Sequence, residues 1–127
     1  MQAEYRARYQ SIYDRADLYV AFIEHGLDLL GPRGVLSFVC ADRWMLNRYG
    51  APLRRLIADK YHVQSYVDLH QASPFESDVT AYPAIFSIGR QSADPVMVAR
   101  LTACSPEECE AIGRSRSAIS PNWMNWR

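Results

Sequence analysis

The residues best equipped for chemistry gather in two short segments, each of which directly follows an apolar run. The first segment carries Asp42, Arg43 and Asn47, and the second carries His70 and Phe75. Charged, amide and imidazole groups can orient a polar ligand, and a ring can stack on a planar one. The sequence contains no recognisable catalytic triad, glycine-rich phosphate loop or paired-histidine metal motif. The pattern therefore indicates a ligand-facing surface without a complete catalytic set.

The same side chains also have a purely structural interpretation. Trp44 and Tyr49 are expected to be packing groups, and Asp42 with Arg43 can form an exposed pair worth well under about 1 kcal/mol. His70 is a lone loop histidine, and such a residue is seldom catalytic without a partner. Residue chemistry alone leaves both interpretations open.

Alternating helices and strands are predicted to position the two segments. Helical spacing of apolar residues predicts a helix at about 16–30, with Leu18, Phe22, Ile23, Leu27, Leu29 and Leu30 on its apolar face. The continuous apolar run at 35–41 predicts a strand buried on both faces. A second helix is predicted at about 51–59, followed by strands at 63–69, 84–88 and 96–101. This order predicts an open α/β sheet, whose ligands bind beyond the carboxyl ends of the strands.

Composition limits the class of protein. The chain has 127 residues, 49% of them hydrophobic, which suits one compact domain. Lys+Arg and Asp+Glu are both 14, so the chain has no net positive charge that would indicate a nucleic-acid partner. No apolar stretch approaches the roughly 20 residues of a membrane span, and the start has no apolar signal core. We therefore expect a soluble, cytoplasmic protein with no membrane partner.

The three cysteines, Cys40, Cys104 and Cys109, are an odd number and do not suggest a disulfide framework. Cys40 falls inside the apolar run at 35–41, where a buried free thiol is expected. No second Cys or His pair accompanies Cys104 and Cys109, so no metal site is predicted.

Three successive stretches carry a resemblance to a known family: DLYVAFIE at 17–24, LLGPRGVLSFV at 29–39 and DRWMLNRYG at 42–50. Over about residues 13–90 the chain resembles the part of gamma-class adenine-N6 DNA methyltransferases that follows the catalytic motif, in the version found in fused restriction-and-modification enzymes. The resemblance implies the C-terminal half of a Rossmann-like sheet of S-adenosylmethionine-dependent methyltransferases. Strands 35–41 and 63–69 would then be parallel, with strand 84–88 inserted antiparallel between them.

The resemblance also implies roles for two aromatic residues. Phe22 matches the ring that lines the adenine pocket of S-adenosylmethionine, with a plain core residue as the alternative. Phe75 matches a loop residue that stacks on the target adenine, with a hydrophobic plug as the alternative. A target base must leave the duplex to be reached, and stacking on a ring recovers about 1–3 kcal/mol. Asp42, Arg43 and Asn47 are expected at the edge of this site.

Two family motifs do not occur in the sequence: the glycine-containing cofactor turn and the Asn-Pro-Pro-Tyr or Asp-Pro-Pro-Tyr catalytic motif. Both belong upstream of Tyr13 in the family order, so the chain is expected to be an internal piece that holds no catalytic residue. Residues 1–13 would be a lead-in, 14–90 a partial methyltransferase domain, and 91–127 an extension toward a target-recognition region. Alone, the chain is expected neither to bind S-adenosylmethionine tightly nor to methylate DNA.

The implied parent protein methylates adenine N6 in a specific DNA sequence, within a restriction-modification or related defence system. A fused or separate nuclease would accompany it, and the oligomeric state is left open. Two alternatives remain at this point. One is a methyltransferase that acts on RNA or on a protein glutamine, and the other is a non-catalytic α/β binding module.

Overall fold

A computed structural model describes residues 2–12, 16–76, 81–92, 96–114 and 118–119. The helices are α1 (Gln2–Arg8), α2 (Leu18–Asp28), α3 (Ala51–Lys60) and α4 (Pro106–Arg114). The strands are β1 (Val35–Ala41), β2 (His62–Asp68), β3 (Pro83–Gly89), β4 (Val96–Arg100) and β5 (Ala118–Ile119). Two single 3-10 turns, Arg43–Met45 and Arg48–Gly50, connect β1 to α3. Among the described helices, none combines the length and the hydrophobicity that crossing a membrane requires.

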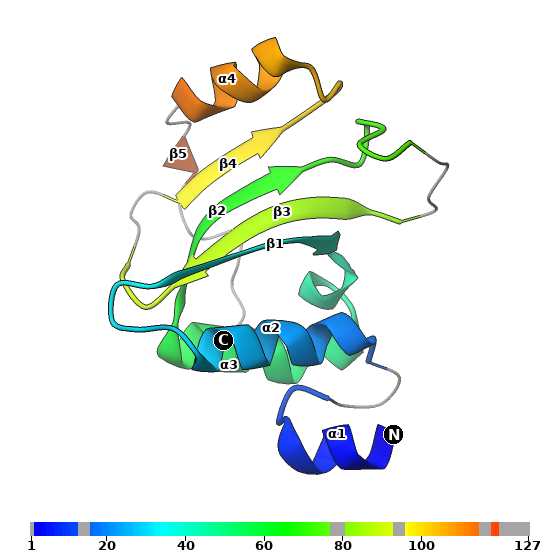
Figure 1. The fold of residues 1–127 in the computed structure, drawn as a ribbon, viewed down its shortest axis with the longest axis vertical. Helices are drawn as coiled ribbons and strands as arrows, with labels where there is room; N and C mark the ends of the chain where they lie inside the picture. Colours follow the sequence, from blue (N-terminus) through cyan, green and yellow to red (C-terminus); the bar gives the residue numbers. More distant parts are fainter. Residues whose placement is uncertain (1, 13–15, 77–80, 93–95, 115–117, 120–127) are drawn as a thin grey trace.

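The strands form one mixed sheet in the order β1-β3-β2-β4-β5 (Figure 1). β3 is antiparallel to both β1 and β2, which are therefore parallel to each other. β4 lies parallel to β2 on its other side. The predicted insertion of strand 84–88 between strands 35–41 and 63–69 is confirmed. The crossover from β1 to β2 runs through α3, as expected for two parallel strands of one sheet.

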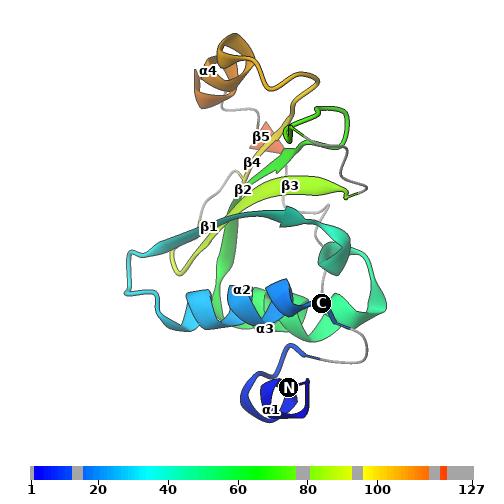
Figure 2. The same ribbon diagram turned by 45° about the vertical axis from the view of Figure 1, so that its right-hand side comes forward.

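Helices cover the two faces of the sheet unequally. α2 and α3 lie side by side on one face (Figures 1 and 2). Their buried side chains include Ile23, Leu27 and Ile57, which belong to one core cluster with Phe86 of β3. A smaller cluster on the opposite face joins Val67, Leu69, Ala72 and Leu101, with Ile112 of α4 packed against it. The fully buried Trp44 anchors the turn after β1 to the larger core. Its ring packs edge-on against that of Phe86, with the ring centroids 5.3 Å apart.

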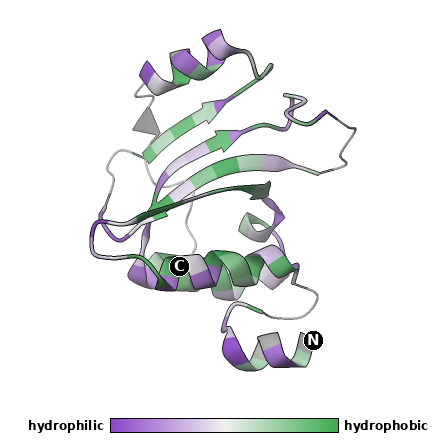
Figure 3. Cartoon of the chain, viewed as in Figure 1, coloured by the Kyte–Doolittle hydropathy of each residue, from purple (hydrophilic) through white to green (hydrophobic). Residues whose placement is uncertain are grey.

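The prediction that 35–41 is buried on both faces is wrong for this chain. β1 is the terminal strand of the sheet, and Val35, Ser37 and Val39 are exposed along one face. Figure 3 shows that β1 is nonetheless largely hydrophobic. In the part of the chain that the structure describes, α4 packs against the β2 and β4 end of this face and leaves the β1 end open. An apolar run shows only that a strand tolerates burial on both sides.

The predicted helix at 16–30 is confirmed as α2, but its buried face was assigned correctly only in part, since Ile23 and Leu27 are buried. Leu18, Phe22 and Leu29 are exposed, whereas the carboxylate-bearing Glu24 is buried. Glu24 accepts hydrogen bonds from the main-chain N–H groups of Gln10 and Ser11 at 3.0 and 2.8 Å. The segment after α1 therefore packs against the side of α2 that carries Glu24. Asp17 occupies the N-cap position of α2 without a capping side-chain bond.

Two further helices were not predicted. α1 lies within the polar segment 1–13, and α4 lies within 105–127, which lacks clear periodicity. α4 has half of a capping box: the Ser105 hydroxyl accepts the N–H of Glu108, whereas the Glu108 carboxylate accepts from the Thr102 hydroxyl and the Ala103 N–H in the preceding loop. Such local bonds can stabilise a helix whose apolar face is small.

Candidate functional site

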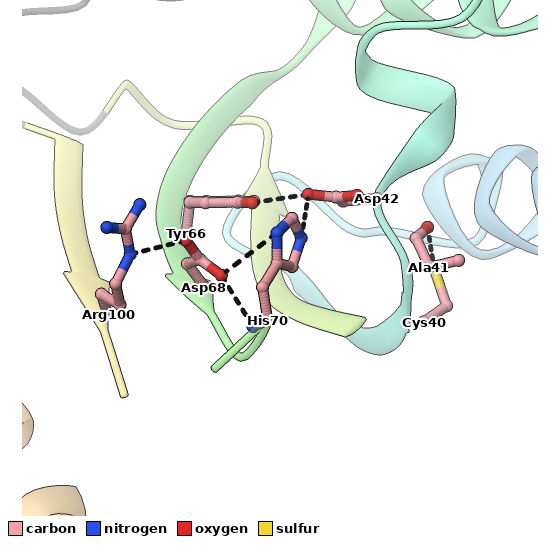
Figure 4. Close-up of polar contacts among 7 residues, drawn as sticks. All are labelled: Cys40, Ala41, Asp42, Tyr66, Asp68, His70 and Arg100. Carbon is pink, nitrogen blue, oxygen red and sulfur yellow. Dashed lines mark hydrogen bonds and ion pairs between the residues drawn. The ribbon is translucent and has the colours of Figure 1, made fainter. Parts of the chain in front are cut away.

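A cluster of polar side chains lies at the edge where the parallel strands β1, β2 and β4 end. Asp42 directly follows β1, Asp68 is the last residue of β2, and Arg100 is the last residue of β4. His70 lies two residues beyond the end of β2 and points between the two aspartates (Figure 4). This is the edge at which the ligands of open α/β sheets bind.

Asp42 is the buried centre of the cluster, with 6% of the residue exposed. The Tyr66 hydroxyl donates to Asp42 Oδ2 at 2.7 Å, and His70 Nε2 lies 2.9 Å from the same oxygen. A carboxylate only accepts hydrogen bonds, so Nε2 carries the proton and donates it. Burial raises the pKa of Tyr66, and its hydrogen bond to Asp42 raises it further. The phenol therefore remains a donor throughout the physiological range.

Asp68 holds the other side of His70. Its Oδ1 accepts the main-chain N–H of His70 at 2.8 Å, and its Oδ2 accepts Arg100 Nε at 2.8 Å. Burial alone would raise the pKa of Asp68, but the bonds from His70 and Arg100 together hold this pKa below its ordinary value. The ring nitrogen Nδ1 of His70 lies 3.7 Å from Asp68 Oδ1, which is too long for a hydrogen bond. His70 thus contacts Asp42 through its side chain and Asp68 through its main chain.

The loop between β2 and β3 is tied down at both of its ends. At one end the Leu69 N–H donates to the Pro83 carbonyl at 3.1 Å, and at the other the Tyr82 carbonyl accepts the Asp42 N–H at 3.0 Å. The Tyr82 ring meets the His70 ring edge-on, with centroids 5.1 Å apart. The segment after β1 and both ends of this loop therefore form one hydrogen-bonded unit.

Phe75 lies in this loop, at the edge where β1 and β2 end. It is 43% exposed, so its ring is not sealed in the core. Ala72, three residues earlier, is buried and donates its N–H to the Leu69 carbonyl. The anchored part of the loop thus extends to within three residues of Phe75. Residues 77–80, which follow, lie outside the described part of the chain.

The predicted site-edge residues fall in different environments. The expected exposed pair of Asp42 and Arg43 is wrong, because Asp42 is buried and the Arg43 guanidinium lies over the Tyr82 ring at 4.7 Å. The Asn47 side chain is exposed, and its main-chain carbonyl accepts Arg54 at 2.8 Å. Asp42 and Arg43 therefore both face the loop that carries Phe75, whereas Asn47 takes part in shaping the turn before α3.

Trp44 and Tyr49 are packing residues, as predicted. Trp44 is fully buried, and Tyr49 packs against the larger core while its hydroxyl bonds that of Tyr19 at 2.8 Å. Phe22 is 53% exposed on α2 and does not belong to the core of this chain, and its role stays a prediction. It belongs to α2, one of the two helices that cover the sheet (Figure 1).

Sequence reasoning missed Tyr66, Asp68, Tyr82 and Arg100 as parts of this cluster. It also treated His70 as a lone residue, whereas the structure gives it two carboxylate partners. One signal was available for Asp68: a carboxylate at the end of a strand, two residues before a histidine. No local signal links Asp42 to Tyr66 or His70, which are 24 and 28 residues away.

Comparison with known proteins identifies the family. Residues 1–75 match the model of the Eco57I restriction-modification methylase family. The chain belongs to this family. It is 54% identical over 97 residues to the Type II methyltransferase M.PaeR7I of Pseudomonas aeruginosa, covering 76% of this chain and 17% of that protein. It is 46% identical over 124 residues to the Type II methyltransferase M.XhoI of Xanthomonas vasicola, covering 94% of this chain and 23% of that protein. The family member described here therefore spans about a fifth of the length of these relatives.

The fold of this methylase-family chain matches a solved structure from Listeria monocytogenes. That protein is described as a class I S-adenosylmethionine-dependent methyltransferase, and the TM-score is 0.68 at 18% sequence identity. The match covers 98% of this chain and 38% of the other. The predicted fold class, part of a Rossmann-like methyltransferase sheet with β3 antiparallel, is thus confirmed.

Proposed function

We propose that this chain is one part of an enzyme that transfers a methyl group from S-adenosylmethionine to adenine N6 in a specific DNA sequence, within a restriction-modification system. Family membership and relatives named as Type II methyltransferases, 46% and 54% identical, support this proposal. A fused or separate nuclease and a cytoplasmic location are parts of the same proposal. The division into 1–13, 14–90 and 91–127 stays a prediction.

The partly exposed ring of Phe75 is the observation that carries the site assignment. Methylation of a base amine requires the base to leave the duplex, which costs its stacking energy. An aromatic ring that remains accessible on an anchored loop can recover about 1–3 kcal/mol of that stacking. Phe75 meets this requirement at 43% exposure, at the edge of the sheet where ligands are expected. Asp42 and Arg43 are its neighbours in the proposed site, with Asn47 at the outer edge.

Phe22 is the residue proposed to contact the cofactor. S-adenosylmethionine supplies an electrophilic methyl group and carries a planar adenine. The half-exposed ring of Phe22 fits one face of that adenine, because an accessible aromatic surface is what such a pocket wall needs. The sequence lacks the glycine-containing turn that would hold the rest of the cofactor. This chain therefore supplies one wall of the cofactor site.

Substitution of Phe75 in the complete enzyme tests the proposal. Phe75→Ala should lower kcat/KM for methylation of duplex DNA by roughly 5-fold to 150-fold, since stacking is worth about 1–3 kcal/mol, while Phe75→Trp should retain most of the rate. The affinity for S-adenosylmethionine should be unchanged. Nucleoside mass spectrometry of the product should detect N6-methyladenine in DNA, and methylated RNA or protein would support another substrate class.

Leu29→Ala is a matched control, because Leu29 is an exposed apolar residue that caps the C-terminal end of α2 and lies outside the loop between β2 and β3. It should change neither rate nor melting temperature. A Phe75→Ala enzyme that unfolds early, while its folded fraction methylates DNA normally, would show that Phe75 only supports the fold.

A further inference from the structure

His70 makes two hydrogen bonds and one aromatic contact with residues at the strand ends. Its Nε2 donates to Asp42, its main-chain N–H donates to Asp68, and its ring contacts that of Tyr82. These partners come from the end of β1, the end of β2 and the residue just before β3. One side chain therefore joins both ends of the Phe75 loop to the neighbouring strand.

Both carboxylates that accept hydrogen bonds from His70 also accept a hydrogen bond from another side chain, which fixes their positions. Asp42 is buried and accepts the Tyr66 hydroxyl on the oxygen that binds His70. Asp68 is buried and accepts Arg100 on the oxygen that does not bind His70. Hydrogen bonds to ionised partners are about twice as strong as neutral ones, so this arrangement resists rotation of the imidazole.

We propose that His70 is a positioning residue that fixes the loop between β2 and β3 so that Phe75 is held ready to stack on the target base. The inference rests on the proposed function of Phe75. The anchored section runs from His70 through the buried Ala72, and Phe75 is only three residues further on. Releasing His70 would free this end of the loop from β1 and let the Phe75 ring sample other orientations.

A direct catalytic role for His70 does not fit its bonding. Its Nε2 proton is committed to the buried Asp42, and Nδ1 lies 3.7 Å from Asp68 Oδ1. The nitrogen that carries the proton, Nε2, is thus occupied by a residue of this chain. His70 therefore acts through the loop rather than on the reacting atoms.

Three variants of the complete enzyme test this inference. His70→Ala removes the side-chain bond, and His70→Asn keeps an amide that is too short to reach Asp42. His70→Gln places an amide nitrogen near the position of Nε2 and can restore the bond. We expect kcat/KM to fall roughly 5-fold or more for alanine and asparagine, within the range for loss of Phe75 stacking, and to recover to within about 3-fold for glutamine.

Fluorescence of 2-aminopurine at the target position provides a readout that a purely structural role would not change. Alanine and asparagine at position 70 should alter the emission of the flipped base, and glutamine should restore it. His62→Ala is the matched control, because His62 is an exposed histidine at the opposite end of β2. If the alanine variant does not fold, the asparagine and glutamine pair decides, and equal rates and equal emission for these two would overturn the inference.

A double-mutant cycle separates this inference from the proposed function. If His70 acts through Phe75, adding His70→Asn to Phe75→Ala should reduce the rate no further. A further reduction equal to that of His70→Asn alone would overturn the positioning role while leaving the stacking role of Phe75 intact. A Phe75→Ala enzyme with a normal rate and normal emission would instead remove the proposed function of Phe75 and, with it, the basis of this inference.

Discussion

Replacing Gly50 with alanine should destabilise the protein far more than the same change at Gly31. Gly50 closes the turn between β1 and α3, and its Cα faces the main chain of Trp44. A β-carbon at Gly50 would lie 2.6 Å from the carbonyl carbon and 2.7 Å from the Cα of Trp44, and closer still to the carbonyl oxygen. At Gly31 nothing lies within 4 Å of the corresponding position.

The loss of stability in Gly50→Ala can be estimated from the main-chain shift that the added β-carbon requires. Carbon atoms pack best at about 3.5–4.0 Å, so the main chain at Trp44 or Gly50 must shift by about 1 Å. Overpacking of this kind costs about 1–3 kcal/mol. The same carbonyl accepts Arg54 at 2.6 Å, and loss of that charge-assisted bond adds about 1.5–3 kcal/mol. Gly50→Ala should therefore cost about 2.5–6 kcal/mol, and Gly31→Ala should stay within about 0.5 kcal/mol.

Urea unfolding followed by far-ultraviolet circular dichroism measures both variants. Gly50→Ala should lower the midpoint at an unchanged denaturant dependence, and Gly31→Ala should leave the midpoint in place. Arg54→Ala removes the bond to Trp44 together with the bond to the Asn47 carbonyl, so its cost sets an upper limit on the hydrogen-bond contribution. Equal midpoints for the two glycine variants would refute the close approach of Gly50 to Trp44.

Three further predictions concern single residues. Burial raises the pKa of the Cys40 thiol to about 12. At pH 8, Cys40 should therefore react with Ellman's reagent at least about 100-fold more slowly than the exposed Cys104 and Cys109. Mass mapping that finds Cys40 labelled first would contradict this prediction. The folded-state pKa of Asp68 lies below the ordinary 3.8, so its charged form stabilises the fold above that pH and the contribution is lost as the pH falls through the lowered value. Asp68→Asn should therefore lose less stability than the unsubstituted protein in an acid titration below about pH 4, and parallel curves would argue against the bonds to Asp68. Trp44→Ala should cost about 3–5 kcal/mol in urea unfolding, and a cost below about 1 kcal/mol would be inconsistent with its full burial.

The sequence by itself determined the local elements. The apolar run at 35–41, the pattern at 63–69 and the helical spacing around Leu53 and Ile57 correspond to β1, β2 and α3. Ser105 followed three residues later by Glu108 is a capping-box signal that would also have located α4. These features were readable because propensity, periodicity and capping act between residues close together in the chain. The strand order β1-β3-β2 followed from the family resemblance, since periodicity does not specify which strands become neighbours.

Only the tertiary structure decided which polar residues form the candidate site. Asp42 looks from the sequence like half of a surface pair with Arg43, yet strand order places it against Tyr66 and His70 and buries it. In the same way, His70 gains its partners because parallel strands end at one edge of the sheet. Burial, pKa shifts and hydrogen-bond partners depend on contacts between residues distant in sequence. A pattern in the sequence can place a residue on a strand or loop, but only the packing of the sheet determines what that residue meets.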